Sequence, residues 1–333
     1  MPDSQPASIE TTANFANSRH RGYRVPNHYS AKHPDDLKTL GSREAIVVHN
    51  ARLLDPAPTL ESHGFQLATA PTTLDLLDND VVRNEFYREC RDLLKRVTGC
   101  DEVRGGGHEY RNGFGGETGP RGVKPTPNGS GGAYAQGIHA DMSPAVEGGF
   151  RRIVPDERHF ESINIWRSAI PETVRLMPLA VCDMRSVRID DIVFGDGQNT
   201  GNIKQYTKVV DQRLIHGPHQ RWYYFPDMTP EEVLLFRQYD TRQEVLNLRT
   251  VFHTAVADPN TPVDAPMRST IEVRMQAIYG EDTDREARAA RFKAAIPKYY
   301  RDGRVCNWWS GPIEGYVPPR GVMKSSRKRV VSG

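Results

Sequence analysis

The sequence predicts a mainly β fold, a sandwich or barrel with a few flanking helices. Short runs of apolar and β-branched residues, separated by turns, recur after residue 140. Helical spacing of apolar residues is confined to two segments. Glycine (28) and proline (24) are frequent, as expected of a chain with many turns. The 333 residues are sufficient for one large domain.

The first third of the chain is predicted to hold two strands and one long helix. Residues 1–20 are rich in Ser, Thr and Asn and poor in apolar residues, so we expect a disordered tail there. Strands are expected over 45–50 and 64–70. Over 73–97, apolar residues recur at spacings of three and four, which predicts a helix packed outside the main sheet. Residues 104–132 contain eleven glycines, and we expect a flexible loop or lid.

The remainder is expected to be β-rich, with a core over about 130–280. The predicted strands are 162–167, 179–183, 187–193, 205–210, 221–225, 233–239, 251–256 and 269–279. Thr229-Pro230 resembles a helix start, but the short apolar run after it favours a turn followed by a strand. A supporting helix over 284–297 and a basic tail over 321–333 complete the single domain expected over 21–320.

Charge and cysteine content exclude several classes of protein. Lys and Arg (44) nearly balance Asp and Glu (42), which argues against a nucleic-acid binder. No run approaches the ~18 apolar residues of a membrane span. The N-terminus lacks a signal-peptide layout, and the four cysteines show no metal-binding spacing, so we expect a cytoplasmic protein with reduced thiols. A homodimer is left open.

A candidate metal site is predicted at His139-Ala140-Asp141. An imidazole and a carboxylate two residues apart at a strand end reach the same ion, as in the 2-His-1-carboxylate triad of non-haem Fe(II) oxygenases. Such triplets also occur by chance, so a third ligand is required. His253, inside the apolar run 251–256, is the candidate, although a histidine there also suits a core position.

The next strand offers a candidate carboxylate receptor. Arg268, Thr270, Glu272 and Arg274 share one face by the two-residue period of a strand. An Arg beside a hydroxyl can bind a carboxylate, with the guanidinium as a two-pronged donor. The same alternation is equally typical of a plain solvent-exposed face.

The ordered motifs resemble a fungal family of non-haem Fe(II)/2-oxoglutarate-dependent hydroxylase/desaturases. The family is similar to gibberellin desaturase and to cephem-methoxylase accessory proteins. The motifs, which lie within residues 46–279, are Asn164-Ile165-Trp166-Arg167, Pro178-Leu179-Ala180-Val181-Cys182-Asp183, Arg221-Trp222-Tyr223-Tyr224, residues 232–240, Phe252-His253 and residues 269–274.

The resemblance implies a double-stranded β-helix core, also called a jelly roll and cupin-like. It also implies that His139, Asp141 and His253 bind Fe(II) and that Arg268 binds 2-oxoglutarate, with Thr270 where the family often has Ser. The 14 residues between His253 and Arg268 are more than is usual in the superfamily, so Arg274 remains a second candidate.

The implied activity is that of a dioxygenase using Fe(II), 2-oxoglutarate and O₂, with ascorbate as a reductant in vitro. Hydrogen abstraction would lead to hydroxylation, desaturation or oxidative cyclisation of a small secondary-metabolite intermediate, first of all an amino-acid-derived one. Candidate substrate contacts are Tyr134, Gln136, Asn164 and Trp166, although plain packing explains each equally well. Two alternatives stay open: a non-catalytic jelly-roll binding or accessory protein, and a zinc hydrolase using the same ligands.

Overall fold

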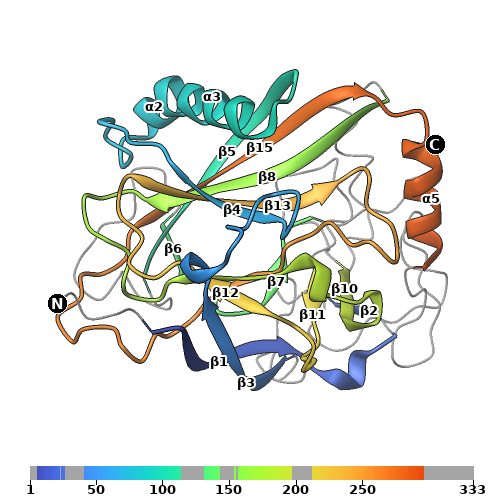
Figure 1. Ribbon diagram of the computed structural model, residues 1–333, viewed down its shortest axis with the longest axis horizontal. Coiled ribbons are helices and arrows are strands. Elements are labelled where there is room, and N and C mark those ends of the chain that lie inside the picture. Colours follow the sequence, from blue (N-terminus) through green and yellow to red (C-terminus); the bar gives the residue numbers. More distant parts are fainter. Residues whose placement is uncertain are drawn as a thin grey trace, which may run out of the picture.

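Two β-sheets face each other in the computed structural model, which describes residues 6–22, 24–26, 41–113, 131–142, 154, 157–196 and 212–295 (Figure 1). From edge to edge, the nine-stranded sheet contains β1 (Ser8–Ala16), β3 (Gly41–Asn50), β12 (Trp222–Tyr224), β9 (Leu179–Cys182), β14 (His253–Ala255), β7 (His139–Ala140), β11 (Gln212–Leu214), β10 (Ile192–Asp196) and β2 (Arg24–Pro26). The six-stranded sheet contains β4 (Phe65–Thr69), β13 (Glu232–Asp240), β8 (Arg158–Ser168), β15 (Thr270–Glu281), β5 (Glu102–Gly113) and β6 (Gly131–Ala133).

From β8 onward the chain passes repeatedly between the two sheets. β8 lies in the small sheet, β9 to β12 lie in the large one, and β13, β14 and β15 then alternate between the sheets. Within the small sheet, β8 pairs antiparallel with both β13 and β15. This topology confirms the predicted mainly β, jelly-roll core.

Helices cover the outer face of the six-stranded sheet. α2 (Asn79–Val81), the π-helical turn η4 (Val82–Phe86) and α3 (Tyr87–Thr98) run as one segment above β5, β15 and β8 (Figure 1). α5 (Arg285–Ala295) lies at one side of the sandwich. Short 3₁₀ turns are η1 (Ser18–His20), η3 (Ala51–Leu53), η6 (Met184–Ser186) and η7 (Ile189–Asp191).

Alternation along β8 divides its side chains between two apolar clusters. Ile163 and Ile165 pack outward, with Leu93 and Leu94 of α3. Trp166 points the other way and packs with residues of both sheets, in a cluster that holds β13 and β12 side chains. The interior of the sandwich therefore also receives Asn164, the other residue in phase with Trp166.

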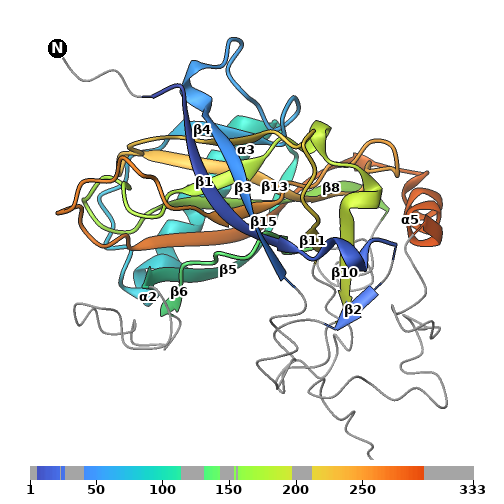
Figure 2. The same ribbon diagram turned by 90° about the horizontal axis from the view of Figure 1, so that it is seen from below.

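The disordered tail expected over residues 1–20 is wrong from Ser8 onward. β1 pairs antiparallel with β3 along its whole length, from Ser8 opposite His49 to Ala16 opposite Gly41 (Figure 2). Buried residues recur along β1 among exposed polar ones, ending with Phe15 and Ala16. The segment has few apolar residues because only one of its faces is covered.

Other boundaries also differ from the prediction. The helix starts at 79 rather than 73 because Asp78 caps it, its carboxylate accepting from the backbone N–H of Asp80 and of Val81. Residues 104–113 of the expected glycine-rich loop belong to β5, and the strand expected over 187–193 begins only at Ile192. The expected strand over 205–210, the rest of the glycine-rich loop up to residue 130 and the tail over 321–333 lie outside the described residues.

Candidate metal centre

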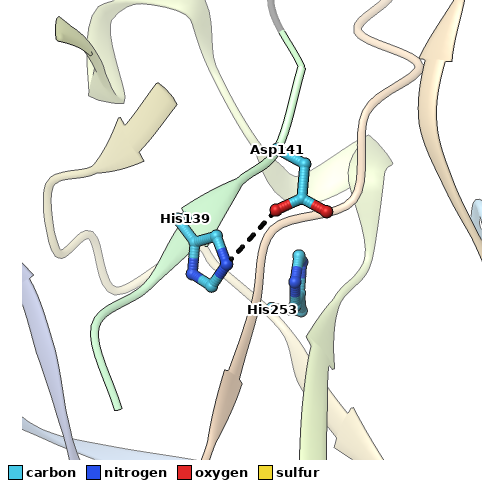
Figure 3. A group of neighbouring side chains, drawn as sticks. All are labelled: His139, Asp141 and His253. Atoms are coloured by element: carbon cyan, nitrogen blue, oxygen red, sulfur yellow. Dashed lines mark ion pairs between the residues drawn. The ribbon is translucent and has the colours of Figure 1, made fainter. Parts of the chain in front are cut away.

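The three predicted ligands meet on adjacent strands of the nine-stranded sheet. His139 begins β7, Asp141 follows its end, and His253 begins β14. The two strands pair antiparallel with His139 opposite His253. One potential ligand atom from each of the three side chains lies within 4.8 Å of the other two, and the side chains converge on a common point (Figure 3).

His139 presents a free lone pair to this point. Its Nδ1 lies 2.8 Å from the Gly137 carbonyl oxygen, which can only accept, so Nδ1 carries the proton. Nε2 is then unprotonated in the neutral ring and lies 3.4 Å from Asp141 Oδ1. Two ligand atoms at right angles on an ion with bonds of about 2.1 Å would lie about 3 Å apart, so this separation suits a shared metal.

The second carboxylate oxygen of Asp141 is held by the opposite sheet. Asn164 Nδ2 donates to Oδ2 at 2.8 Å, and Arg274 Nε donates to the same oxygen at 3.2 Å. Asn164 and Arg274 are themselves opposite each other in the β8–β15 pairing. Asp141 therefore has one oxygen facing the histidines and the other fixed by two donors.

Electrostatics favour the metal-binding forms of Asp141 and His253. Burial alone would raise the pKa of Asp141, but the Arg274 charge and the His139 hydrogen bond hold that pKa well below its ordinary value. Burial lowers the pKa of His253 to about 3, so this imidazole is neutral at physiological pH. Burial also acts to lower the pKa of His139, but the neighbouring Asp141 carboxylate outweighs this and raises the pKa, so a metal ion binding there would displace a proton from the protonated form of His139.

This donor set fits a divalent transition metal. Two neutral imidazoles and one carboxylate on one side of a point leave further coordination positions for other ligands, as mononuclear non-haem Fe(II) sites require. The Nδ1–H bond to Gly137 and the donors on Asp141 Oδ2 are the outer contacts that orient metal ligands in proteins.

A second group of three potential ligands, His159, Glu161 and Asp240, is already neutralised. Arg242 lies 2.8 Å from a Glu161 oxygen and 3.1 Å from Asp240, and Arg249 also pairs with Asp240. Three carboxylates and three arginines meet in this network once Glu61 and Arg237 are included. It is an ion-pair cluster, in contrast to the open donor set around His139.

Arg268 is a buried cation close to the chain segments that carry the ligands. It is 4% exposed, and its guanidinium carbon lies 4.3 Å from the centre of the Tyr134 ring and 5.6 Å from that of Trp166. Tyr134 packs with Ala255, two residues after His253. One N–H of Arg268 donates to the Met177 carbonyl, and Nε is buried without a hydrogen-bond partner among the described residues.

Of the remaining predicted site residues, Thr270 and Tyr134 are buried and Gln136 is exposed. Thr270 is buried, and its hydroxyl lies 3.4 Å from the Arg111 carbonyl. Tyr134 donates its hydroxyl to the Arg268 carbonyl at 2.8 Å. Gln136 does not share the burial of Tyr134: it is exposed, because the chain between β6 and β7 is not a regular strand.

Sequence reasoning missed Gln238, which touches the backbone beside two of the ligands. Its side-chain oxygen accepts from the Asp141 N–H at 2.7 Å, and its amide group donates to the Val251 carbonyl at 3.0 Å. The available signal was an amide side chain within the apolar run 233–239. A buried amide needs partners, and the partners here could not be named without the fold.

A jelly-roll sandwich with a buried 2-His-1-carboxylate group defines a mononuclear non-haem metalloprotein. The family model described as "Oxidoreductase/YMDC permease-like domain" matches residues 13–278. The chain belongs to this oxidoreductase family.

Similar curated proteins come from fungi. The chain is 28% identical to "Hydroxylase/desaturase efuI" of Hormonema carpetanum, over 73% of this chain and 86% of the relative. It is 27% identical to "Fe(II)/2-oxoglutarate-dependent dioxygenase nvfI" of Aspergillus novofumigatus, over 70% of this chain and 82% of the relative. These matches confirm that the chain resembles fungal hydroxylase/desaturases, as its motifs predict.

A solved structure shares the fold. The "iron and alpha-ketoglutarate-dependent endoperoxidase NvfI" superimposes with a TM-score of 0.65 at 24% identity, covering 83% of this chain and 99% of that one.

Among the described residues, no helix has both the length and the apolar character needed to cross a membrane.

Proposed function

We propose that this protein is an Fe(II)/2-oxoglutarate-dependent oxygenase acting on a small secondary-metabolite intermediate. The observation that carries the proposal is the convergence of His139, Asp141 and His253 within 4.8 Å. These side chains would hold the iron. Iron and 2-oxoglutarate bound there would supply the O₂-dependent hydrogen abstraction needed for hydroxylation, desaturation or cyclisation.

Arg268 is the best candidate to bind the distal carboxylate of 2-oxoglutarate. Burial lowers its pKa to about 10, so it stays protonated at neutral pH, and among the described residues it has no carboxylate partner. A buried charge without a counter-charge is costly, and a dicarboxylate co-substrate would supply the counter-charge. Arg274 is a weaker candidate because it already pairs with Asp141, with Glu272 at 2.8 Å and with Glu109 at 3.4 Å.

Charged side chains near the ligands support a polar, amino-acid-derived substrate. Glu272 lies opposite Trp166 on one neighbouring strand and opposite Glu109 on the other. Glu272 and Arg274 are two residues apart on β15 and therefore share a face, and Arg274 Nε contacts Asp141. The Glu109 and Arg111 side chains of β5 are partly exposed and pair with each other at 2.7 Å. A substrate that enters past β5 would meet carboxylates and guanidinium groups, which suits ammonium, carboxylate or amide groups better than a bare hydrocarbon.

We also propose a cytoplasmic location. The three described cysteines, Cys90, Cys100 and Cys182, are buried and unpaired. Free buried thiols are typical of reducing compartments.

The test is release of labelled CO₂ from 2-oxoglutarate by protein loaded anaerobically with Fe(II) and then exposed to O₂. We expect CO₂ release that depends on both iron and O₂ and is absent in His253→Ala. Stoichiometric iron binding without CO₂ release would favour a binding protein. Hydrolysis by the zinc-loaded protein at a rate that does not depend on 2-oxoglutarate would favour a hydrolase. Full activity of His253→Ala would contradict the ligand assignment.

A further inference from the structure

Gln238 is an extra residue in its strand. In the pairing of β13 with β8, Arg237 lies opposite Ile163 and Tyr239 lies opposite Ser162, so Gln238 has no partner of its own in the ladder. Such a bulge changes the direction of a side chain, and bulges are frequent next to active sites. The side chain of Gln238 is completely buried.

The amide of Gln238 joins two chain segments that are far apart in sequence. Its Oε1 accepts from the backbone N–H of Asp141 at 2.7 Å. Its Nε2 donates to the carbonyl of Val251, two residues before His253, at 3.0 Å. The Val251 N–H in turn donates to the Arg237 carbonyl at 2.9 Å, which keeps the two segments aligned.

We propose that Gln238 is a positioning residue that sets the spacing of the metal ligands before the metal binds. One hydrogen bond fixes the backbone of Asp141, and the other fixes the entry to the strand that carries His253. The inference rests on the proposed metal site, but it concerns a residue that does not itself coordinate the ion.

The chemistry of glutamine explains why this residue type is needed. A side-chain amide offers an acceptor and two N–H donors on one planar group, and the contacts here use all of them, because Nε2 also donates to the Arg237 carbonyl at 3.3 Å. Glutamate would keep the bond from the Asp141 N–H but would place a carboxylate against the Val251 carbonyl. Methionine has similar length and volume but neither strong bond.

The experiment measures Co(II) binding by the absorption of its d–d bands in the full-length protein. For Gln238→Met we expect about 10- to 100-fold weaker Co(II) affinity, as is usual when an outer contact of a metal site is removed, and a changed band shape. Gln238→Glu should lie between this variant and the parent. Gln276→Met is the matched control, because Gln276 is also buried, lies on β15 and has no hydrogen bond to either ligand segment among the described residues.

Each outcome decides the question. Parental affinity and an unchanged spectrum in folded Gln238→Met would overturn the inference and leave the metal site intact. A parent protein that binds no Co(II) would overturn the metal site, and the inference with it. If Gln238→Met does not fold, Gln238→Glu decides: weakened affinity supports the positioning role, and parental affinity contradicts it.

Discussion

Asp141 uses its two carboxylate oxygens differently. Oδ1 faces His139, whereas Oδ2 accepts from Asn164 and Arg274. A ligand whose second oxygen is fixed cannot rotate away from the metal, so Asn164 acts on the orientation of Asp141.

Replacing Asn164 by Leu should weaken metal binding by about 10- to 100-fold, because Asp141 Oδ2 loses the shorter of its two hydrogen bonds. Titration with Mn(II), followed by electron paramagnetic resonance, measures this. Ser162→Ala on the same strand is the control, since the Ser162 hydroxyl has no hydrogen-bond partner among the described residues. Equal affinity in the two variants would mean that Asn164 has no such role.

Arg268 and Arg274 should fail in different ways. Arg268→Met removes the proposed partner of a buried carboxylate and should raise the KM for 2-oxoglutarate by at least about 30-fold, with little change in metal affinity. Arg268→Lys should be intermediate because it keeps the charge and loses the planar fork. Arg274→Met should instead weaken metal binding, since Arg274 holds Asp141. If Arg274→Met instead raised the KM for 2-oxoglutarate and Arg268→Met weakened metal binding, Arg274 would be the 2-oxoglutarate-binding residue and Arg268 the residue that holds Asp141.

Residue type and order predict the candidate triad, and the structure brings its three side chains together. His139, Asp141 and His253 carry their chemistry in their side chains, so a search for His-x-Asp followed by a strand histidine finds them. The sequence indicates Asn164 only as a candidate substrate contact. Its bond to Asp141 depends on how the two sheets face each other, which no local pattern encodes.

Among the elements, β5 shows how glycine misleads a prediction. Its three consecutive glycines lie at a bulge opposite β15, where two residues of β5 face one of β15. Gly105 has φ +85°, and a Cβ there would meet the Gln276 side-chain oxygen. The glycines therefore permit a strand with a bulge here, although their number predicted a loop.

Gly105→Ala should destabilise the protein by about 1–3 kcal/mol, because alanine is strained at positive φ and would meet Gln276. Urea unfolding measures the change. Gly107→Ala, two residues away, meets no atom of the described residues within 4 Å and should change the free energy of unfolding by no more than about 0.5 kcal/mol. Equal effects of the two substitutions would exclude the bulge as the cause.

For the molecule as a whole, β1 is part of the folded unit. Phe15 is 2% exposed, and its ring makes edge contacts with His216 at 5.0 Å and Trp222 at 5.9 Å. The sequence concealed this because a strand covered on one face needs few apolar residues.

Phe15→Ala should therefore cost about 3–5 kcal/mol, as for other buried aromatic residues. Chemical denaturation measures it, with exposed Glu10→Ala as the control on the same strand. A loose tail would give no difference between these variants.

The buried ion-pair cluster should make stability depend on acid. Burial would raise the pKa of Asp240, but hydrogen bonding by His159 and the charges of Arg237 and Arg249 hold it far below its ordinary value. The stabilisation is then complete above the unfolded-state pKa of about 3.9 and is lost as the pH falls towards the lower folded-state pKa.

Asp240→Asn should lower the free energy of unfolding by about 3–5 kcal/mol at pH 7, because among the described residues Arg237 and Arg249 keep only Glu161 and Glu61 and the buried cluster is left with one uncompensated positive charge. The gap to the parent should stay constant down to about pH 5 and narrow below about pH 4. Urea unfolding across this range tests it, with Asp227→Asn as a half-exposed control. A gap that widens in acid would contradict the assignment.

The origin of the metal-site contacts in two sheets has a consequence for the lifetime of the protein. The proposed ligands come from the nine-stranded sheet, whereas Asn164, Arg274 and Gln238 belong to the six-stranded one. A bound ion would link the two sheets through these contacts and stabilise the folded state by mass action. Protein that has lost its ion should open more often between the layers and be digested sooner by proteases. Iron supply would then set how much of the protein survives, as well as how fast it works.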